Sequence, residues 1–466
     1  MNDEQSIQRT NSSQHSTETD NLHETEFPWL REIPPHWTVS RLKYLRDPFI
    51  PIVYGIILPG PDQDEGVPII KGGDCKTGEL NPETLSKTTP EKASEYQRSR
   101  LRAGDLVYEI RGSVGRVVKV PPELEGANLT QDTARIAPRE DVNEDWLIYA
   151  LRSEVFRQQM DLHTRGATVQ GVNLFDLRRG ILPIPPLEEQ RAIAEFLDHH
   201  TARTDALVTK QKRLLNLFDE KRQSLITQAV TTGLDSTVTT QSTEAQWLAE
   251  IPEHWDVVRT RFVARLESGH TPSRSNDEYW EDCNIPWVTT SDIKPFREGQ
   301  KIHLEDTEYK ISQLGLENSG ARILPEGTVF VSRTASVGFS GIMADKMATS
   351  QDFANWVCGD EIIPEYLLYV FRSMDQEFDR LMQGSTHQTI YMPDIRSFKT
   401  PLPPVEEQRE IVEHIQNETE QLWNLIDNVE RSIDLLEEKR QALITAAVTG
   451  QIDVTENRDE THATHR

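Results

Sequence analysis

Two stretches of the chain carry apolar residues at helical spacing over an unusual length. The first extends from Pro185-Pro186 to Gly233, and the second from Pro403-Pro404 to Gly450. Proline suits the start of a helix, an acidic pair in the first turn is favoured by the helix dipole, and glycine suits the position after the last turn. Each pair of signals encloses about 44 residues, which predicts two helices of about 65 Å at ~1.5 Å per residue.

The apolar residues in both helices are spaced for packing of one helix against another. In the first helix this face is marked by Leu197, Phe218 and Leu225, with Ile193, Leu207 and Leu214 at the partner position. In the second helix it is marked by Ile415, Leu422, Val429, Leu436 and Leu443, with Ile411 and Leu425 at the partner position. A repeat of about 3.5 residues is typical of a coiled coil. Because a whole domain separates the two helices in sequence, we expect them to pair antiparallel with a globular module at each end. The alternative is two amphipathic helices that each lie on their own globular domain.

The stretches that precede the two helices have a different pattern. Short runs rich in valine, isoleucine and aromatic residues are bounded by Gly, Pro or Asp, as in GVPIIKG, DLVYEIRGSVGRVVKV and GTVFVSRTASVGF. Such runs predict β-strands joined by turns. Each stretch also contains apolar residues at helical spacing, in DWLIYALRSEVFRQQM and PEYLLYVFRSMDQEFDRLM. The sequence therefore predicts an α+β fold.

Short motifs recur at a common offset of 218 residues, so the chain contains an internal repeat. WLREIPPHW at 29–37 returns as WLAEIPEHW at 247–255, PIPPLEEQR at 183–191 returns as PLPPVEEQR at 401–409, and EKRQ at 220–223 returns at 438–441. The rest of the two modules hardly matches. This predicts two unlike α+β modules separated by two long antiparallel helices that form a coiled-coil spacer, with pseudo-two-fold symmetry. The predicted boundaries are a disordered acidic tail at 1–26, module 1 at 27–182, long helix 1 at 183–232, a linker at 233–246, module 2 at 247–400, long helix 2 at 401–450 and a second disordered tail at 451–466.

The overall charge limits how this chain can contact nucleic acid. It has 50 Lys and Arg against 76 Asp and Glu among 466 residues, for a formal net charge of −26. A chain this acidic does not coat nucleic acid or an anionic membrane by bulk charge, so any such contact must be local. The sequence has no run of ~18 uncharged apolar residues, its acidic start is no signal peptide, and its cysteines are too few for a disulfide framework. We therefore expect a cytoplasmic protein in a reducing environment.

Common catalytic motifs are missing from the sequence. It contains no phosphate-binding GxxxxGK loop, no HExxH, no CxxC pair and no GxSxG nucleophile elbow. It also lacks the Asn- or Asp-Pro-Pro-Tyr/Phe motif of base-amino methyltransferases. The sequence therefore predicts a non-catalytic chain that has no metal site or cofactor of its own.

The repeated motifs resemble those of the specificity subunit of type I restriction-modification enzymes. The resemblance rests on the duplicated IPxHW, the divergent module, the PxPPxEEQR motif that opens each long helix and the EKRQ within it, and it covers residues 27–453. It implies that the modules are target-recognition domains, each reading one half of a bipartite double-stranded DNA target. The first module departs from the family because it lacks the GxTP opening that the second has in GHTP.

The same resemblance implies partner proteins. These are two methyltransferase subunits, which use S-adenosylmethionine to methylate adenine, and motor-nuclease subunits that translocate and cut DNA. S-adenosylmethionine, ATP and Mg are therefore expected in the partner subunits.

Candidate DNA contacts lie in basic and polar loops, because affinity for DNA comes from phosphate contacts and specificity from base edges. The segment QRSRLRAGDLVYEIRGSVGRVVKV carries six basic and two acidic residues, against the acidic balance of the whole chain. The loops RGATVQG, GSTHQTIY and GHTPS add polar side chains. An ordinary basic or polar surface is the alternative for each residue. The candidates are Arg98, Arg100, Arg102, Arg111, Ser113, Arg116, Arg165, Thr168, Gln170, His270, Thr271, Ser273, Arg333, Thr334, Ser336, Ser385, His387, Gln388 and Tyr391.

A competing function is a coiled-coil adaptor whose modules bind proteins or peptides. This function requires the same two modules and paired helices, but the modules would not bind DNA. Trp37 and Trp255, each of which follows Pro-x-His, are expected to anchor the start of each module rather than to stack on bases.

Overall fold

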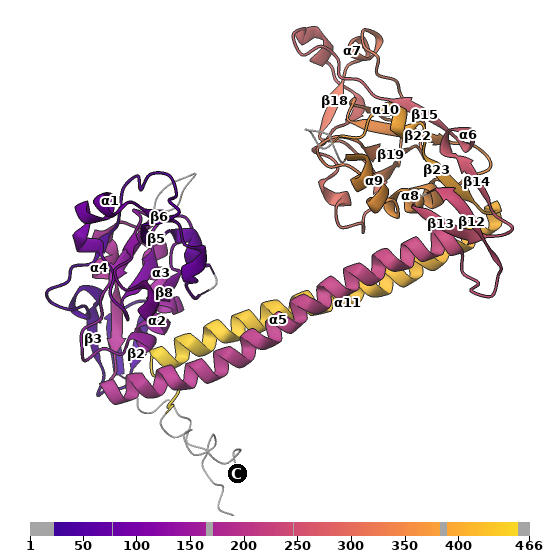
Figure 1. Ribbon diagram of the computed structural model, residues 1–466. Coiled ribbons are helices and arrows are strands. Elements are labelled where there is room, and N and C mark those ends of the chain that lie inside the picture. Colours follow the sequence, from indigo (N-terminus) through magenta and orange to yellow (C-terminus); the bar gives the residue numbers. More distant parts are fainter. Residues whose placement is uncertain (1–22, 77, 165–170, 246, 383–388, 455–466) are drawn as a thin grey trace, which may run out of the picture. The chain divides into compact units, whose positions relative to one another are not determined.

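The computed structural model describes residues 23–76, 78–164, 171–245, 247–382 and 389–454 (Figure 1). These residues divide into two compact units. Unit 1 contains the described residues up to Thr209 and from Ser432 onward, and unit 2 contains Lys210–Arg431. Each unit therefore holds one variable module together with one part of each long helix.

The module of unit 1 is built on a four-stranded antiparallel sheet. Its strands are β1 (His23–Phe27), β2 (Leu30–Ile33), β3 (Thr38–Arg41), β4 (Val53–Tyr54), β5 (Val67–Ile70), β6 (Lys87–Thr88), β7 (Leu106–Glu109), β8 (Val117–Lys119), β9 (Asn128–Leu129), β10 (Thr133–Ile136) and β11 (Ile181–Ile184). The main sheet has the order β4-β10-β7-β8, beside a three-stranded sheet β6-β5-β9 and the pairs β11-β3 and β1-β2. All residues of β7 and β10 are buried, so the main sheet is covered on both faces.

Helices cover this sheet and connect it to the first long helix. They are α1 (Pro90–Glu95), α2 (Glu144–Arg152), α3 (Glu154–His163) and α4 (Leu174–Arg179). The Asn143 side chain caps α2 by accepting from the Trp146 N–H, and Ser153 caps α3 in the same way. The Asn143 N–H in turn donates to the buried Gln190 side chain at 2.8 Å. The glutamine of the EEQR motif thus fixes the start of α2 against the long helix.

The module of unit 2 follows the same plan with a five-stranded sheet, β15-β22-β19-β20-β17, in which β15 is an edge strand. Its Gln408 accepts from the Ile363 N–H at 3.0 Å, as Gln190 does from Asn143. The predicted α+β class is therefore confirmed in both modules. The strands are β12 (Thr240–Ala245), β13 (Leu248–Pro252), β14 (Asp256–Arg259), β15 (Ala264–Ser268), β16 (Ile285–Val288), β17 (His303–Leu304), β18 (Tyr309–Ile311), β19 (Val329–Ser332), β20 (Ser340–Met343), β21 (Ala348–Thr349), β22 (Phe353–Cys358) and β23 (Lys399–Leu402). The helices are α6 (Thr260–Val263), α7 (Gln313–Glu317), α8 (Pro364–Arg372), α9 (Asp375–Met382) and α10 (Met392–Ile395).

The two predicted long helices are present as α5 (Leu187–Thr232) and α11 (Val405–Val448). In unit 1 the start of α5 packs against the end of α11, where Ile193 and Leu197 share a core with Ile444. In unit 2 the end of α5 packs against the start of α11, where Ile226 shares a core with Ile411. The helices are therefore antiparallel within each unit, as predicted.

The apolar face of the helix pair differs from the predicted one away from the modules. Leu207, Leu214 and Leu425 were expected on it but are 43%, 38% and 47% exposed. Leu422 is buried as predicted, together with Ile426 and Ile433, which the prediction did not place on this face. In a straight helix of 3.6 residues per turn, positions that repeat every 3.5 residues rotate gradually around the helix axis. A strict heptad pattern read from one end of the helix therefore no longer marks the buried face near its middle.

The repeated motifs meet at the start of each long helix. Trp37 and His36 of IPPHW contact the two carboxylate oxygens of Glu189, each at 2.8 Å. In unit 2 His254 contacts Glu407 at 2.9 Å, and Trp255 is buried beside Gly233 at the end of α5. Both tryptophans thus have the predicted anchoring role.

Five predicted boundaries differ from the structure. The predicted starts of the long helices, at 183 and 401, fall inside β11 and β23, and α5 and α11 begin at Leu187 and Val405 after the Pro-Pro pairs. The predicted N-terminal tail includes most of β1, and the predicted linker includes β12. Each forms a hairpin with the following strand, so that Glu24 lies opposite Glu32 and Gln241 opposite Ile251. Both strands consist mostly of polar residues and are held by backbone hydrogen bonds. They therefore lack the alternation of apolar and polar residues by which a half-buried strand is predicted from sequence. In the predicted C-terminal tail, Val454 is buried in the core of unit 1.

Two further features concern the residues that the structure describes. None of their helices is long and apolar enough to cross a membrane. Cys75 is buried, and burial raises the pKa of its thiol to about 12.

Candidate nucleic-acid interface

In unit 1 the β7–β8 hairpin turn, residues 110–116, meets two other loops. The backbone N–H groups of Ile110 and Arg111 donate to the carbonyl of Asp132, at 2.8 and 3.2 Å. The N–H of Val172, which follows the predicted RGATVQG loop, donates to the Ile110 carbonyl at 2.9 Å. Arg111 also forms a β-bridge with Gly171. The structure thus joins two of the predicted segments with the Gln131-Asp132 turn.

Unit 2 builds the same junction from different residues. The Arg333 N–H donates to the Asp352 carbonyl, and the Ile390 N–H donates to the Arg333 carbonyl, both at 2.9 Å. Thr334 forms the β-bridge with Thr389. The β19–β20 turn therefore has the same neighbours as the β7–β8 turn.

A fourth loop closes each junction and begins at a glycine. A Cβ added to Gly55 would lie 1.9 Å from the Leu129 carbonyl oxygen, and one added to Gly269 would lie 2.2 Å from the Thr349 carbonyl oxygen. The Ile56 N–H donates to Leu129, and the His270 N–H donates to Thr349. The segment from Gly55 to Pro59 of module 1 therefore occupies the place of GHTP in module 2. We call these four loops of each unit the reading platform: residues 55–59, 110–116, 130–132 and 171–172 in unit 1, and 269–273, 333–339, 350–352 and 389–391 in unit 2.

The platform of unit 1 contains residues that sequence reasoning missed. Ile57 and Leu58 are 42% and 79% exposed, and Leu58 has a φ of 57°. A bulky residue in this left-handed region is uncommon, because its Cβ crowds the backbone there. Leu58 lines a cleft together with Lys71, Arg111 and Gln131. The one local signal was a glycine followed within four residues by a proline in both modules.

A buried carboxylate lies under the Arg111 turn. Glu109 is 4% exposed, accepts from the Ser113 N–H at 3.1 Å and lies 3.7 Å from the Arg116 guanidinium. Burial raises the pKa of this carboxyl, against the opposing effect of the Ser113 hydrogen bond. Arg111 and Ser113 are exposed at the surface of the turn, whereas Arg116 is half-buried.

Several candidates in unit 2 make internal hydrogen bonds. The Arg333 guanidinium donates to the carbonyls of Gln351 and Ile390, at 2.8 and 3.3 Å. The Thr334 hydroxyl donates to Asp352 at 2.8 Å, and Thr271 donates to the Gln351 side chain at 2.6 Å. These side chains therefore stabilise the platform itself. His270, Ser273 and Tyr391 are exposed, and Ser336 is half-buried.

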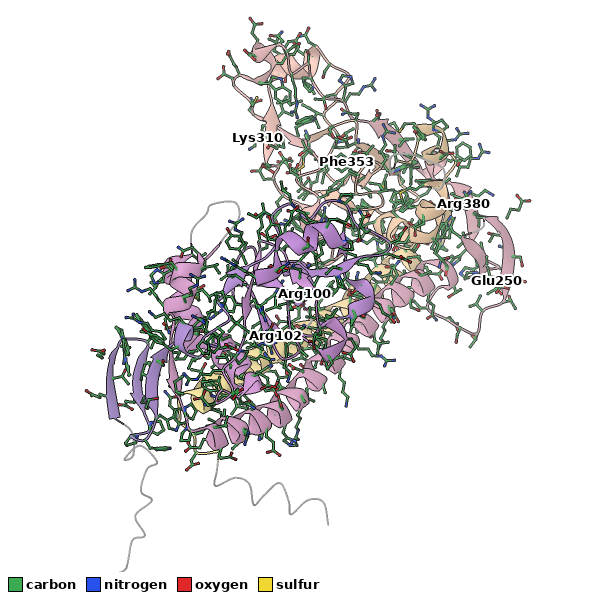
Figure 2. The ribbon with its side chains drawn as sticks, turned by 60° about the vertical axis from the view of Figure 1, so that its left-hand side comes forward. Arg100, Arg102, Glu250, Lys310, Phe353 and Arg380 are labelled. Carbon is green, nitrogen blue, oxygen red and sulfur yellow. The ribbon has the colours of Figure 1, made fainter. Side chains whose placement is uncertain are left out.

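The basic run of module 1 does not form one patch. Arg98, Arg100 and Arg102 precede β7, and Figure 2 labels two of them, Arg100 and Arg102. Arg111 and Arg116 follow β7, in the hairpin turn at its other end. The length of the strand therefore separates the first three arginines from the platform. Six further candidates, Arg165, Thr168, Gln170, Ser385, His387 and Gln388, lie outside the described residues.

Comparison with known proteins identifies the family of both modules. Residues 61–217 and 252–443 match the type I restriction modification DNA specificity domain. The chain belongs to this family. The matched residues include most of each module and much of each long helix, so the resemblance first seen in short motifs extends through both repeats.

Curated members of the specificity family resemble this chain over one repeat or both. The MjaIX specificity subunit of Methanocaldococcus jannaschii is 28% identical over 192 residues, which are 41% of this chain and 43% of that protein. The EcoBI specificity subunit of Escherichia coli is 27% identical over 222 residues, which are 47% of this chain and 45% of that protein. These two alignments thus span less than half of each relative. The putative MjaX specificity subunit of M. jannaschii is 22% identical over 93% of this chain and 97% of its own length.

A solved structure shares the fold. It belongs to a study of complex assembly and conformational transition of the type I R-M system, with a TM-score of 0.65 and 21% identity over 90% of this chain and 99% of that chain. Both modules therefore belong to a family of DNA specificity domains.

Proposed function

We propose that this chain is the specificity subunit of a type I restriction-modification complex in which each module reads one half of a bipartite DNA target. The observation that carries the proposal is the reading platform, which recurs in both units with different side chains. Ile56 in unit 1 stands where His270 stands in unit 2, and the exposed Ile57 and Leu58 follow Ile56 where Thr271 follows His270. Matching backbone hydrogen bonds with unlike side chains suit two readers of different sequences.

The partners of the chain follow from this proposal. They are double-stranded DNA, two methyltransferase subunits that methylate adenine, and motor-nuclease subunits. The relatives named above are specificity subunits of type I restriction enzymes, which supports these partners. We propose that S-adenosylmethionine, ATP and Mg act in the partner subunits, and that this chain is not itself an enzyme. The complex would act on DNA in the cytoplasm.

We further propose that the two long helices set the distance between the half-sites. Helices α5 and α11 contain 46 and 44 residues. At ~1.5 Å per residue each is about 65 to 70 Å long. Because DNA presents the same face every ~34 Å, a stiff spacer of this length favours a fixed separation of the half-sites.

The adaptor function gains no support. The relatives reported above are all named as restriction enzyme subunits, and none is named as an adaptor.

Methylome sequencing of the host tests the proposal directly. We expect one bipartite motif with methylated adenine in each half, and its loss on deletion of this chain. A gel-shift assay of the chain with its methyltransferase partner should then show a complex with that motif and not with a scrambled duplex. An unchanged methylome together with no sequence-dependent complex would contradict the proposal.

A further inference from the structure

A basic groove leads from the reading platform of unit 2 to the opposite end of the main sheet, where Arg261 and Phe262 lie. It lies along the edge strand β15, between α6 and α10, and is lined by Arg261, Phe262, Arg265 and Arg396, among others. Its lining ends at Ser268, the residue before Gly269 of the platform. The described residues that line the groove include three arginines and no acidic residue. This is unusual in a chain with a net charge of −26.

The charges and the aromatic ring of the groove are open to solvent. Phe262 is 69% exposed, and the Arg261 guanidinium lies 5.3 Å from the centre of its ring. Arg265 pairs with Glu267 at 2.7 Å, so Arg261 and Arg396 supply the remaining positive charge. Both of these arginines are exposed.

Unit 1 carries the same residue types at the same positions of the repeat. At the 218-residue offset, Lys43 corresponds to Arg261, and Tyr44 corresponds to Phe262. Lys43 Nζ lies 4.6 Å over the Tyr44 ring, which is 57% exposed. The preceding backbones also correspond, because Leu42 N–H donates to Gly180 and Thr260 N–H donates to Phe398. A second cation matches as well, Arg178 with Arg396, although Arg178 also donates to the Ile52 carbonyl.

These positions flank the repeated motifs, since Lys43 follows Trp37 by six residues and Arg178 precedes Pro183 by five, so they belong to the part of each module that the repeat keeps alike. A surface that differs between modules suits the two different half-sites. A surface that is the same in both suits a ligand that is the same at both ends. The sugar-phosphate backbone is such a ligand, since it carries a regular negative charge whatever the base sequence.

We propose that this groove, and the matching surface around Lys43 and Tyr44, bind the DNA backbone next to each half-site. The inference rests on the proposed function and extends it. The platform reads bases, while the groove supplies sequence-independent affinity through its cations and an exposed aromatic ring. The methyltransferase subunit is the other ligand common to both ends, but an exposed arginine groove without lining acids favours phosphate.

The test measures DNA affinity against salt concentration. The complex of this chain with its methyltransferase subunits is titrated onto the target duplex and onto an unrelated duplex of equal length. Each phosphate contact contributes about 0.9 to the slope of log K against log salt concentration. The variant Arg261→Ala/Arg396→Ala should lower that slope by about 1.8 and weaken binding to both duplexes by a similar factor, about tenfold. Lys43→Ala should do the same in unit 1 by about half as much.

Two controls keep the result interpretable. Lys346→Ala removes one exposed cation beyond β20, at the end of that strand away from the platform, and should leave the slope unchanged. Arg261→Lys/Arg396→Lys keeps the charge and should retain most of the slope, which also controls for loss of folding.

Three outcomes would overturn the inference. They are an unchanged slope in the double alanine variant, a loss confined to the target duplex, and loss of the methyltransferase subunits with the slope retained. The last would make the groove a protein interface. Failure of the unsubstituted complex to bind DNA would instead refute the proposed function.

Discussion

Gln441, on the second long helix, donates from its side-chain amide to the backbone carbonyl of Arg152 at 2.9 Å. Arg152 ends α2, and the last carbonyls of a helix have no partner within it. Gln223 does the same for the Arg372 carbonyl at the end of α8, at 2.6 Å. The glutamine of each EKRQ motif therefore ties the long helix of one repeat to the module of the other.

Replacing Gln441 should weaken unit 1. Gln441→Ala leaves the Arg152 carbonyl without this donor, so the free energy of unfolding should fall by about 1 kcal/mol. Urea unfolding measures the change. Gln228→Ala removes an exposed glutamine of α5 and serves as the control. Equal midpoints for the two variants would show that the cross-repeat bond contributes nothing.

The two anchoring tryptophans should respond differently to the same substitution. Trp37 donates to Glu189, whereas the buried indole nitrogen of Trp255 has no hydrogen-bond partner among the described residues. Trp→Phe removes a similar amount of apolar surface at both positions. Trp37→Phe should therefore cost about 1.5 kcal/mol more than Trp255→Phe, because only Trp37 loses a bond to a carboxylate. Chemical denaturation of both variants checks this difference, and the reverse order would contradict it.

The glycine after α11 should not tolerate a side chain. Gly450 has a φ of 72°, and an added Cβ would lie 2.4 Å from the Pro34 ring. We expect Gly450→Ala to destabilise the protein by about 2 kcal/mol, about half of it from backbone strain. Gly233→Ala should cost less, since its nearest contact would be the Trp255 ring at 3.2 Å. Gly73→Ala, with nothing within 4 Å of the added Cβ, is the thermal-melting control.

The buried Glu109 should impose a pH dependence on stability. Burial raises the pKa of this carboxyl above its unfolded value, so the native state retains the proton to higher pH. The free energy of unfolding therefore falls as the pH rises from the unfolded pKa through the folded pKa. Glu109→Gln should remove the part of this decrease in the free energy of unfolding that comes from ionisation of Glu109. Urea unfolding between weakly acidic and neutral pH measures it, with Glu123→Gln as an exposed control; identical pH profiles for wild type and Glu109→Gln would refute it.

The arginines of module 1 should differ in their contribution to DNA affinity according to their distance from the reading platform. Arg111 lines the cleft beside Leu58, whereas Arg102 lies beyond the other end of β7. Arg111→Ala should weaken binding to the target duplex by about tenfold, in the range of a base or phosphate contact. Arg102→Ala should change it much less. Anisotropy titrations of both variants measure the two affinities. Equal losses of affinity would contradict this prediction and would keep Arg98, Arg100 and Arg102 as candidate DNA contacts.

The sequence was informative wherever the signal is local. Proline pairs, acidic first turns and a terminal glycine predicted α5 and α11, and the motif offset predicted the repeat. β12 escaped prediction because TQSTEA is polar and its pairing is visible only once the chain has folded. Leu58 was missed for a similar reason, since Gly55 packs on the carbonyl of Leu129, a residue distant in sequence. Arg102 and Arg111 were grouped together because they are close in sequence, but β7 between them places them at opposite ends of a strand.

The composition of unit 1 has a consequence for biosynthesis. Its core includes Ile444, Ala447 and Val448 beside residues from the beginning of the chain. Unit 2, by contrast, is one uninterrupted segment, Lys210–Arg431. Since a ribosome releases the chain from its N-terminus, the module translated first must wait with an open core until α11 emerges, and unit 2 can mature before it. An emerging chain of this kind exposes its earliest apolar residues longest, so chaperone capture during translation should concentrate on the first module.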